Sequence, residues 1–267
     1  MAFKPASNLL NIVPKVVKKE NRYCEKHGDF LSEFRSEAMG WSGCAECLKD
    51  SYYEIAKLYK GDVDAVGIQG DMNLKIKQSG IPERFSSKNF NGYVIDENNE
   101  KQRVIFDFCT SYALNFEKAK RTGQSFMLLG GVGTGKTHLA VVIAIEVMKR
   151  RHSVVFTSAS KLIRSIINTY SKGSDQRESE AIAIYTDCDL LIIDEVGVQR
   201  GTHYEKDMIF DVINERYENL RPTIVLSNLN LAEIRKYLGE RVLDRFRENE
   251  GKAFLLDWDS YRGRVDA

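Results

Sequence analysis

The sequence has little proline, little tryptophan and no excess of charge of either sign. Only 4 of its 267 residues are proline, against 19 glycines, which excludes collagen-like and proline-rich architectures. Lysine and arginine together number 39, and aspartate and glutamate 38. No overall basic excess therefore indicates nucleic-acid binding, and any DNA contact must come from a local patch.

Long apolar runs and an even set of cysteines are also missing. No run approaches the ~20 apolar residues that span a bilayer. The first twenty residues lack the uninterrupted apolar core and the small-residue cleavage site of a secretory signal. Five cysteines are an odd number, which argues against a disulfide framework. We therefore expect a cytoplasmic protein without membrane contact.

What the sequence does contain, beyond about residue 80, is an alternation of short apolar strands with helical segments. Strands are predicted within 125–130, 153–158, 189–195, 222–228 and 252–258, and helices over 100–120, 136–151 and 160–167. This order predicts an α/β fold with a parallel sheet between helices. We expect an N-terminal region at 1–60, a glycine-punctuated linker at 61–80, and the α/β domain at 81–267.

Residues 130–137, Gly-Gly-Val-Gly-Thr-Gly-Lys-Thr, match the phosphate-loop pattern G-x-x-x-x-G-K-[ST] between a strand and a helix. The glycines let backbone N–H groups face a phosphate, and the helix N-terminus adds partial positive charge. Lys136 is predicted to contact the β- and γ-phosphates of ATP, and Thr137 to bind Mg²⁺. The flanking strand and helix disfavour the alternative, a glycine-rich turn without chemistry. The predicted nucleotide-binding residues are Gly130, Gly131, Val132, Gly133, Thr134, Gly135, Lys136, Thr137 and His138.

Two later strands end in polar residues, at the edge where open α/β sheets bind ligands. Asp194 is predicted to hold Mg²⁺, and Glu195 to act as the general base for an attacking water. Such a pair can also be a strand end that meets solvent, but its distance from the phosphate loop suits a second nucleotide motif. Asn228 is predicted to contact the γ-phosphate or the water, with a turn-forming asparagine as an equal alternative. Asp189, at a strand entry, is expected to be a cap or surface group.

Several segments resemble DnaC-type bacterial replicative helicase loaders. They are 79–82 (SGIP), 89–93 (NFNGY), 131–140 (GVGTGKTHLA), 190–199 (LLIIDEVGVQ), 226–228 (LSN), 238–247 (LGERVLDRFR) and 258–264 (WDSYRGR). The resemblance covers residue 79 to the end and implies an AAA+ P-loop ATPase. It implies that the protein binds the hexameric replicative helicase, loads that helicase onto single-stranded DNA, and self-associates into an ATP-dependent spiral or ring. By resemblance, Lys136 and Thr137 belong to Walker A, Asp194 and Glu195 to Walker B, and Asn228 to sensor 1.

Five arginines near the C-terminal end are candidates for a catalytic role. They are Arg241, Arg245, Arg247, Arg262 and Arg264, and each taken alone is more often a surface residue. Spacing does not choose among them. The resemblance implies that Arg245 is the arginine finger offered to a neighbour's ATP and that Arg262 is sensor 2.

A small module at 24–47 carries four soft ligands in two pairs, Cys24-x-x-His27 and Cys44-x-x-Cys47. Paired spacings with a loop between them predict a structural, tetrahedral Zn²⁺ site. Unrelated thiols and a disulfide are the alternatives. The module is similar in kind to the zinc-binding N-terminal domain of DnaI-type loaders. Two further cysteines, Cys109 and Cys188, are expected in the core.

The predicted helix at 160–167 places Lys161 and Arg164 on one face. The resemblance puts an element that tracks single-stranded DNA near this helix, and a local positive groove suffices for such tracking. The alternative is a crossover helix with a solvated basic face. Two other functions compete with helicase loading: an IstB-type transposition helper ATPase, and a helicase adaptor switched by nucleotide without hydrolysis. Glu195 argues against the adaptor, since a switch needs no base.

Overall fold

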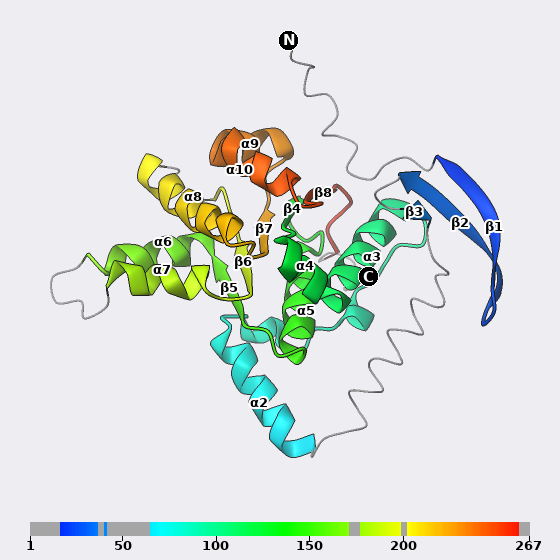
Figure 1. Ribbon diagram of the computed structural model, residues 1–267, viewed down its shortest axis with the longest axis horizontal. Helices are drawn as coiled ribbons and strands as arrows, with labels where there is room; N and C mark the ends of the chain where they lie inside the picture. The colour runs from blue at the N-terminus through cyan, green and yellow to red at the C-terminus, as the bar shows by residue number, and fades with distance from the viewer. Residues whose placement is uncertain (1–16, 37–39, 42–64, 171–176, 199–201, 262–267) are drawn as a thin grey trace, which may run out of the picture. The chain divides into compact units, whose positions relative to one another are not determined.

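The computed structural model describes residues 17–36, 40–41, 65–170, 177–198 and 202–261 (Figure 1). Contacts divide the chain into two compact units, Met1–Gly70 and Asp71–Ala267. Among the described helices, none is both long enough and apolar enough to cross a membrane.

The first unit contains a small antiparallel sheet in the order β1-β2-β3. Its strands are β1 (Lys18–Cys24), β2 (Gly28–Ser36) and β3 (Gly40–Trp41). Cys24 pairs with Gly28, so residues 25–27 form a tight hairpin turn. The sequence analysis predicted a metal module here but not its strands.

Helix α2 (Ala65–Gln78) occupies most of the interval that we expected to be a linker. Gly67 and Gly70 lie inside this helix, so the expectation that glycines punctuate a linker there is wrong for these two positions. After α2, the carbonyl of Ser79 accepts a hydrogen bond of 2.7 Å from the N–H of Phe156. That bond covers part of the outer edge of strand β5, which would otherwise present unpaired backbone groups.

The second unit is built on a five-stranded sheet in the order β5-β6-β7-β4-β8, with every neighbouring pair parallel. The strands are β4 (Phe126–Gly130), β5 (Val154–Ser158), β6 (Leu190–Asp194), β7 (Thr223–Ser227) and β8 (Lys252–Leu256). The five predicted strands and the parallel sheet are therefore confirmed.

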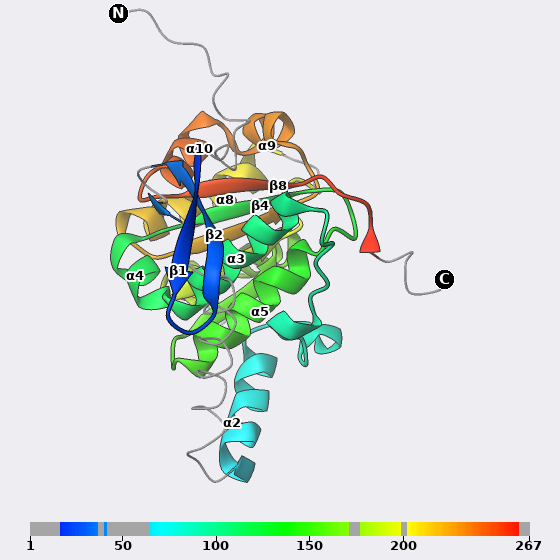
Figure 2. The same ribbon diagram turned by 90° about the vertical axis from the view of Figure 1, so that its right-hand side faces the viewer.

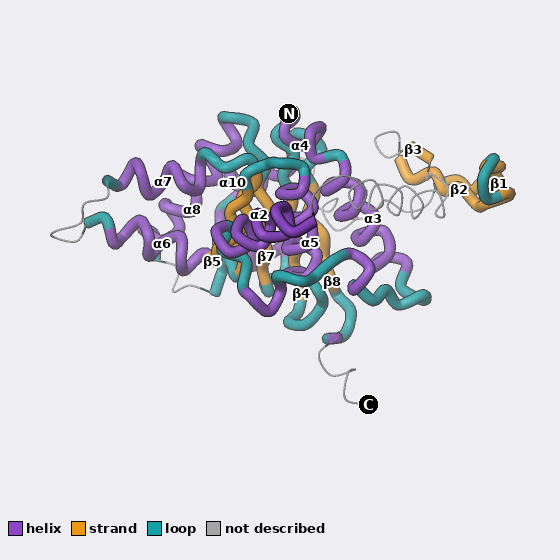
Figure 3. The backbone as a smooth tube through the Cα atoms, turned by 90° about the horizontal axis from the view of Figure 1, so that it is seen from below, coloured by secondary structure: helices purple, strands orange, loops and turns teal. Residues whose placement is uncertain are grey.

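Helices cover both faces of this sheet (Figures 2 and 3). They are α3 (Glu100–Leu114), α4 (Phe116–Thr122), α5 (Lys136–Lys149), α6 (Ala159–Asn168), α7 (Glu178–Thr186), α8 (His203–Glu218), α9 (Leu231–Leu238) and α10 (Glu240–Arg247). On one face, α6, α8, α9 and α10 pack on Met127, Ile193 and Val225. On the other face, Phe108 and Tyr112 of α3 contact the ring of Phe126 edge-on.

The single helix predicted over 100–120 is two helices, which meet at Asn115. The carbonyl of Ser111 accepts from both the backbone N–H of Asn115 at 2.9 Å and its side-chain amide at 3.0 Å, which caps the end of α3. The break turns Phe116 into the core, where it is fully buried with its ring 6.0 Å from that of Tyr112.

Arg216 of α8 is fully buried and is bonded to several backbone segments. Its Nη1 donates to the carbonyls of Tyr185 and Cys188 at 2.8 Å each, and its Nη2 donates to the carbonyl of Pro222 at 2.6 Å. Its Nε donates to Thr223 Oγ1 at 3.0 Å. One side chain therefore joins the segment before β6 to the start of β7.

We expect Arg216→Met to lower the free energy of unfolding by about 3 kcal/mol, because several buried acceptors lose their donor together. Urea denaturation followed by circular dichroism measures the change. Arg103→Met, at an exposed position of α3, is the control and should leave the urea midpoint close to that of the wild type. Equal midpoints for the two variants would contradict the prediction.

Candidate nucleotide-binding site

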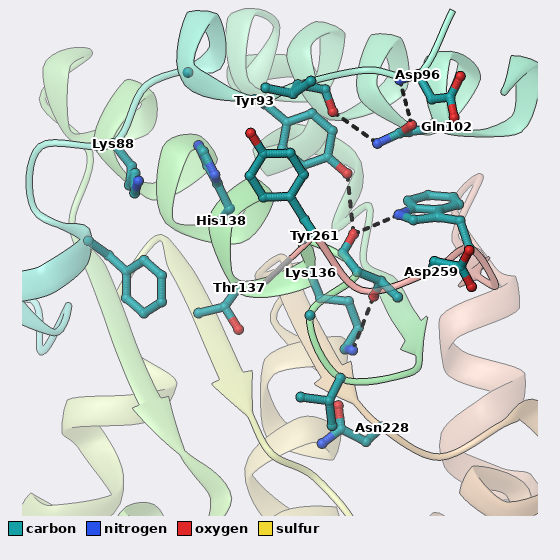
Figure 4. Close-up of a pocket in the computed structure, with 18 of the residues that line it drawn as sticks. Lys88, Tyr93, Asp96, Gln102, Lys136, Thr137, His138, Asn228, Asp259 and Tyr261 are labelled. Atoms are coloured by element: carbon teal, nitrogen blue, oxygen red, sulfur yellow. Dashed lines mark hydrogen bonds between the residues drawn. The ribbon is translucent and has the colours of Figure 1, made fainter. Parts of the chain in front are cut away.

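The carboxyl ends of β4, β6 and β7 open onto a cavity of about 530 Å³, a size typical of small-molecule sites (Figure 4). Four parts of the chain line it. They are the phosphate loop with the first turn of α5, the residues that follow β6 and β7, the segment 84–102, and residues 258–261. Lys136, Thr137, Asp194, Glu195 and Asn228 thus share one cavity, as the parallel sheet requires.

Lys136 begins α5 and is held within the phosphate loop itself. Its side chain is buried, and Nζ donates to the carbonyls of Gly130 and Gly131 at 2.7 and 2.6 Å. The loop therefore carries an ammonium group beside the first turn of a helix, the end of a helix that favours an anion. This arrangement suits a polyphosphate.

Thr137 and Asp194, far apart in the sequence, are joined by a hydrogen bond. The Thr137 hydroxyl donates to Asp194 Oδ2 at 3.1 Å, and the N–H of Glu195 donates to Oδ1 at 2.7 Å. Burial raises the pKa of Asp194 in spite of these two donors. A buried carboxylate beside a hydroxyl is a donor set that fits Mg²⁺, because oxygen ligands suit this ion and its charge would offset the cost of burial.

Glu195 and Asn228 are set by the loops that follow two adjacent strands. Glu195 has a φ of 58°, in the left-handed region, which turns the chain sharply after β6. Ser227, the last residue of β7, donates its hydroxyl to the carbonyl of Val196 at 2.5 Å. That bond ties the two loops together, so Glu195 and Asn228 are held beside the same cavity.

Tyr93 forms part of the cavity wall, and the sequence analysis assigned it no role. Its hydroxyl donates to the carbonyl of Thr134 at 3.4 Å. Its ring stacks on Phe106 and contacts His138 edge-on, with centroids 5.6 and 5.4 Å apart. Burial raises the pKa of Tyr93 to about 12, so its hydroxyl stays protonated at neutral pH. Gln102 fixes the same wall by donating to the carbonyl of Val94 at 3.1 Å.

Residues 257–261, which we call the C-terminal strap, run from β8 across the phosphate loop. Trp258 Nε1 donates to the carbonyl of Thr134 at 3.0 Å, and the N–H of Tyr261 donates to the carbonyl of Gly133 at 3.0 Å. Asp257 is paired with Lys101 of α3 at 2.6 Å. The sequence singled out this segment only for its resemblance, and no local signal indicated these bonds.

Two glycines of the loop are required by these neighbours. A Cβ atom at Gly133 would lie 2.0 Å from Ser260 Oγ, and one at Gly135 would lie 2.6 Å from the ring of Tyr93. Both residues also have a positive φ, of 80° and 95°. Part of the glycine pattern of this loop is therefore explained by packing as well as by phosphate binding.

Other predicted residues lie away from the cavity or outside the described part of the chain. Lys161 and Arg164 are exposed on α6, as the predicted shared face requires. The guanidinium of Arg245 on α10 lies 4.9 Å from the ring centroid of Phe210, and Arg245 does not line the cavity. Arg262 lies outside the described residues, directly after Tyr261.

The predicted zinc ligands are described only in part. Cys24 Sγ lies 3.6 Å from His27 Nδ1 across the β1–β2 turn. Cys44 and Cys47 lie outside the described residues, and within the described part of the chain no group of three metal-ligating side chains occurs.

The remaining expectations on single residues are confirmed. Cys109 and Cys188 are buried. Asp189 caps the strand entry by accepting from the N–H of Ser153 at 2.9 Å and pairs with Lys120 at 2.8 Å. Burial acts to raise the pKa of Asp189, but the bonds from Lys120 and Ser153 outweigh it and leave this pKa below its usual value.

Comparisons with known proteins agree with this geometry. The model of the family described as IstB-like ATP binding protein matches residues 92–262. The replicative helicase loader DnaC of Escherichia coli strain K12 is 39% identical over 194 residues, which are 73% of this chain and 77% of the relative. A crystal structure of the DnaC helicase loader superposes with a TM-score of 0.55 at 23% identity, covering 65% of this chain and 99% of that one. A crystal structure of DnaI gives a TM-score of 0.55 at 20% identity, covering 68% and 95%.

The bond between Thr137 and Asp194 yields a prediction on Mg²⁺. We expect Thr137→Val to weaken binding of ATP about tenfold in the presence of Mg²⁺, because an oxygen ligand is lost, and to change it little in EDTA. Titration of a fluorescent ATP analogue in both buffers measures the two affinities. An equal loss in EDTA would show that Thr137 acts on the loop and not on the metal.

Proposed function

The chain belongs to the IstB-like ATP binding proteins and, among them, to the DnaC-type replicative helicase loaders, and from this premise we propose that it loads a replicative helicase onto single-stranded DNA in an ATP-dependent manner. One observation carries the proposal. Five of the seven segments that resemble the loaders contribute residues to one cavity, where the phosphate loop meets the carboxylates of Asp194 and Glu195 and the amide of Asn228.

We propose that ATP is hydrolysed in this cavity. Lys136 and the loop N–H groups bind the β- and γ-phosphates, and Thr137 and Asp194 hold Mg²⁺, which neutralises charge on the phosphate oxygens when bound. Glu195 accepts a proton from the water that attacks the γ-phosphorus, and Asn228 orients that water. His138 lines the same cavity next to Thr137, and burial lowers its pKa, which favours the neutral imidazole there.

Arg245 acts, in this proposal, on the nucleotide of a neighbouring copy. It lies on α10 outside the cavity of its own chain, stacked on Phe210 and with its guanidinium 5.4 Å from the ring of Tyr217. Its Nη1 is buried without a hydrogen-bond partner in the described part of the chain. A guanidinium that lies against aromatic rings keeps its full positive charge, which suits a phosphate supplied in trans. Self-association into a spiral or ring would bring the two together, and Arg262 would complete the site as sensor 2.

Single-stranded DNA is proposed to bind along α6. This helix presents Lys161 and Arg164 to solvent, and beyond its end lies Tyr170, whose side chain is 52% exposed. Tyr204, at the start of α8 and 51% exposed, contacts Tyr170 through the hydroxyl groups. Exposed cations and exposed aromatic rings are the two kinds of group with which proteins grip a single strand without reading its sequence.

The N-terminal region, residues 1–60, is proposed to contact the helicase through a zinc module, with residues 61–80 joining it to the ATPase domain at 81–267. In a tetrahedral zinc site, a sulfur and a nitrogen ligand lie about 3.5 Å apart, given metal–ligand distances of about 2.3 and 2.0 Å. Cys24 Sγ and His27 Nδ1 are 3.6 Å apart. This spacing supports a structural Zn²⁺ bound by Cys24, His27, Cys44 and Cys47.

The family match also supports an alternative, a transposition helper ATPase of the IstB type. Such a protein would assemble on duplex DNA and engage a transposase. A nucleotide-switched adaptor that does not hydrolyse ATP is the other competing function. Formation of a complex with the helicase would distinguish the proposal from the first alternative. ATP turnover would distinguish it from the second.

We expect a defined complex of a helicase hexamer with several copies of this chain in native mass spectrometry with the host's replicative helicase, ATP and Mg²⁺. The spectrum of the free chain should carry one zinc-sized mass increment. The variant Lys161→Glu/Arg164→Glu is the matched control, since it should bind helicase normally but retain little of an added single-stranded oligonucleotide. ATP hydrolysis on duplex DNA without a helicase complex would favour the transposition-type function.

Mixed subunits test the trans role of Arg245. We expect Glu195→Gln to bind ATP without turnover, and Arg245→Ala to bind ATP with turnover reduced at least tenfold. Mixing the two variants should restore part of the activity, because the intact Glu195 and the intact Arg245 then meet at one interface. Phosphate release measured against mixing ratio shows this. Full turnover by Arg245→Ala alone would contradict the role, and full turnover by Glu195→Gln would remove the assigned base.

A further inference from the structure

The carbonyl of Thr134, in the middle of the phosphate loop, accepts hydrogen bonds from two side chains that lie outside the loop. Trp258 Nε1 donates at 3.0 Å and the Tyr93 hydroxyl at 3.4 Å. The dashed lines of Figure 4 include both bonds. The peptide between Thr134 and Gly135 is planar and trans, so its N–H must turn whenever its carbonyl turns. The two donors therefore set the direction of the Gly135 N–H.

In a trans peptide the N–H points away from the carbonyl. With the Thr134 carbonyl directed toward Trp258 and Tyr93, the N–H of Gly135 is directed to the inner side of the loop. In this loop type, successive N–H groups on the inner side face the phosphates. The preceding peptide is held in the same way, because its carbonyl, that of Gly133, accepts from the N–H of Tyr261 at 3.0 Å.

Both donors are held in place by contacts of their own. The C-terminal strap leaves the sheet at Leu256, which pairs with Gly130, and it is tied to α3 by the ion pair of Asp257 with Lys101. Tyr93 is 9% exposed and packed on Phe106. An indole N–H is a donor only, and a carbonyl oxygen can only accept, so both side chains must donate in their bonds to Thr134.

We infer that Trp258 is a positioning residue for nucleotide binding, whose indole N–H, together with the Tyr93 hydroxyl, sets the orientation of a phosphate-binding amide before the nucleotide arrives. The C-terminal strap is then a part of the phosphate site and not only a continuation of β8. The inference rests on the proposed ATP-binding function. Trp258 acts through the loop, so it changes how well phosphates are held and leaves the hydrolytic groups in place.

Trp258→Phe tests this, because it keeps an aromatic ring and removes the N–H. Loss of one neutral hydrogen bond to an oriented peptide should raise the Kd for ADP with Mg²⁺, and the KM for ATP, about three- to tenfold. The value of kcat should stay within about twofold, since ground and transition states lose the same contact. Tyr93→Phe should raise both constants less, because its bond is longer.

Trp41→Phe is the matched control and also a probe. It makes the same chemical change in strand β3 of the first unit and leaves Trp258 as the one remaining tryptophan of two. Its affinity for ADP should equal that of the wild type. Its emission should change on titration with ADP and Mg²⁺, at the concentration that saturates the site.

Each outcome decides the inference. Unchanged Kd and KM in Trp258→Phe overturn it. A rise in Kd and KM also overturns it if two further results are found together: nucleotide-free Trp258→Phe melts at a lower temperature than the wild type, and Trp258 emission in Trp41→Phe does not respond to ADP. If Trp258→Phe does not fold, the emission measurement alone decides: a response supports the inference and its absence overturns it. A wild-type chain that binds no ADP contradicts the proposed function itself, a result distinct from all of these.

Discussion

The parallel pairing of β4 with its two neighbours is the constraint on which the rest of the site depends. Parallel strands end at the same edge of a sheet, and here β4, β6, β7 and β8 all end beside one cavity. The phosphate loop leaves β4 at Gly130, directly beside Leu256 of β8. The hydrogen bond between Thr137 and Asp194 then closes the site across the sheet. A slip of one strand would separate the groups that line this cavity.

The phosphate loop is shared between two sets of partners. Its inner side carries Lys136 and the N–H groups that suit a polyphosphate, and its carbonyls at 133 and 134 are bonded to the C-terminal strap and to Tyr93. Gly133 and Gly135 serve both sides, because a Cβ at either would collide with an outer partner. Changes in the strap or in the segment around Tyr93 can therefore alter the proposed nucleotide binding through the loop, as well as through the cavity wall that both segments form.

Helix α8 supports the side chain that is proposed to act on a neighbour's nucleotide. This helix follows Glu195 in the chain, after a short connection, and its Phe210 and Tyr217 carry the guanidinium of Arg245. The arginine proposed for the neighbour's site therefore rests on the helix that comes next in the chain after the loop of Glu195.

The elements that have a local sequence signal could be predicted from the sequence alone. Short apolar runs predicted the strands, and the Gly-Lys-Thr pattern predicted the loop. Polar residues at the end of a strand or directly after it indicated Asp194, Glu195 and Asn228 as candidates. Local signals failed where long-range packing decides where a helix ends. The predicted helix at 100–120 is split at Asn115, and Phe116 is buried in the core. Helix α2 continues through Gly67 and Gly70. Only the tertiary structure placed Tyr93 and Trp258 on the carbonyl of Thr134, from positions 41 residues before it and 124 residues after it. Hydrogen bonds between such distant segments have no periodicity along the chain, and that of Trp258 exists only because β8 pairs with β4 and carries the strap to the loop.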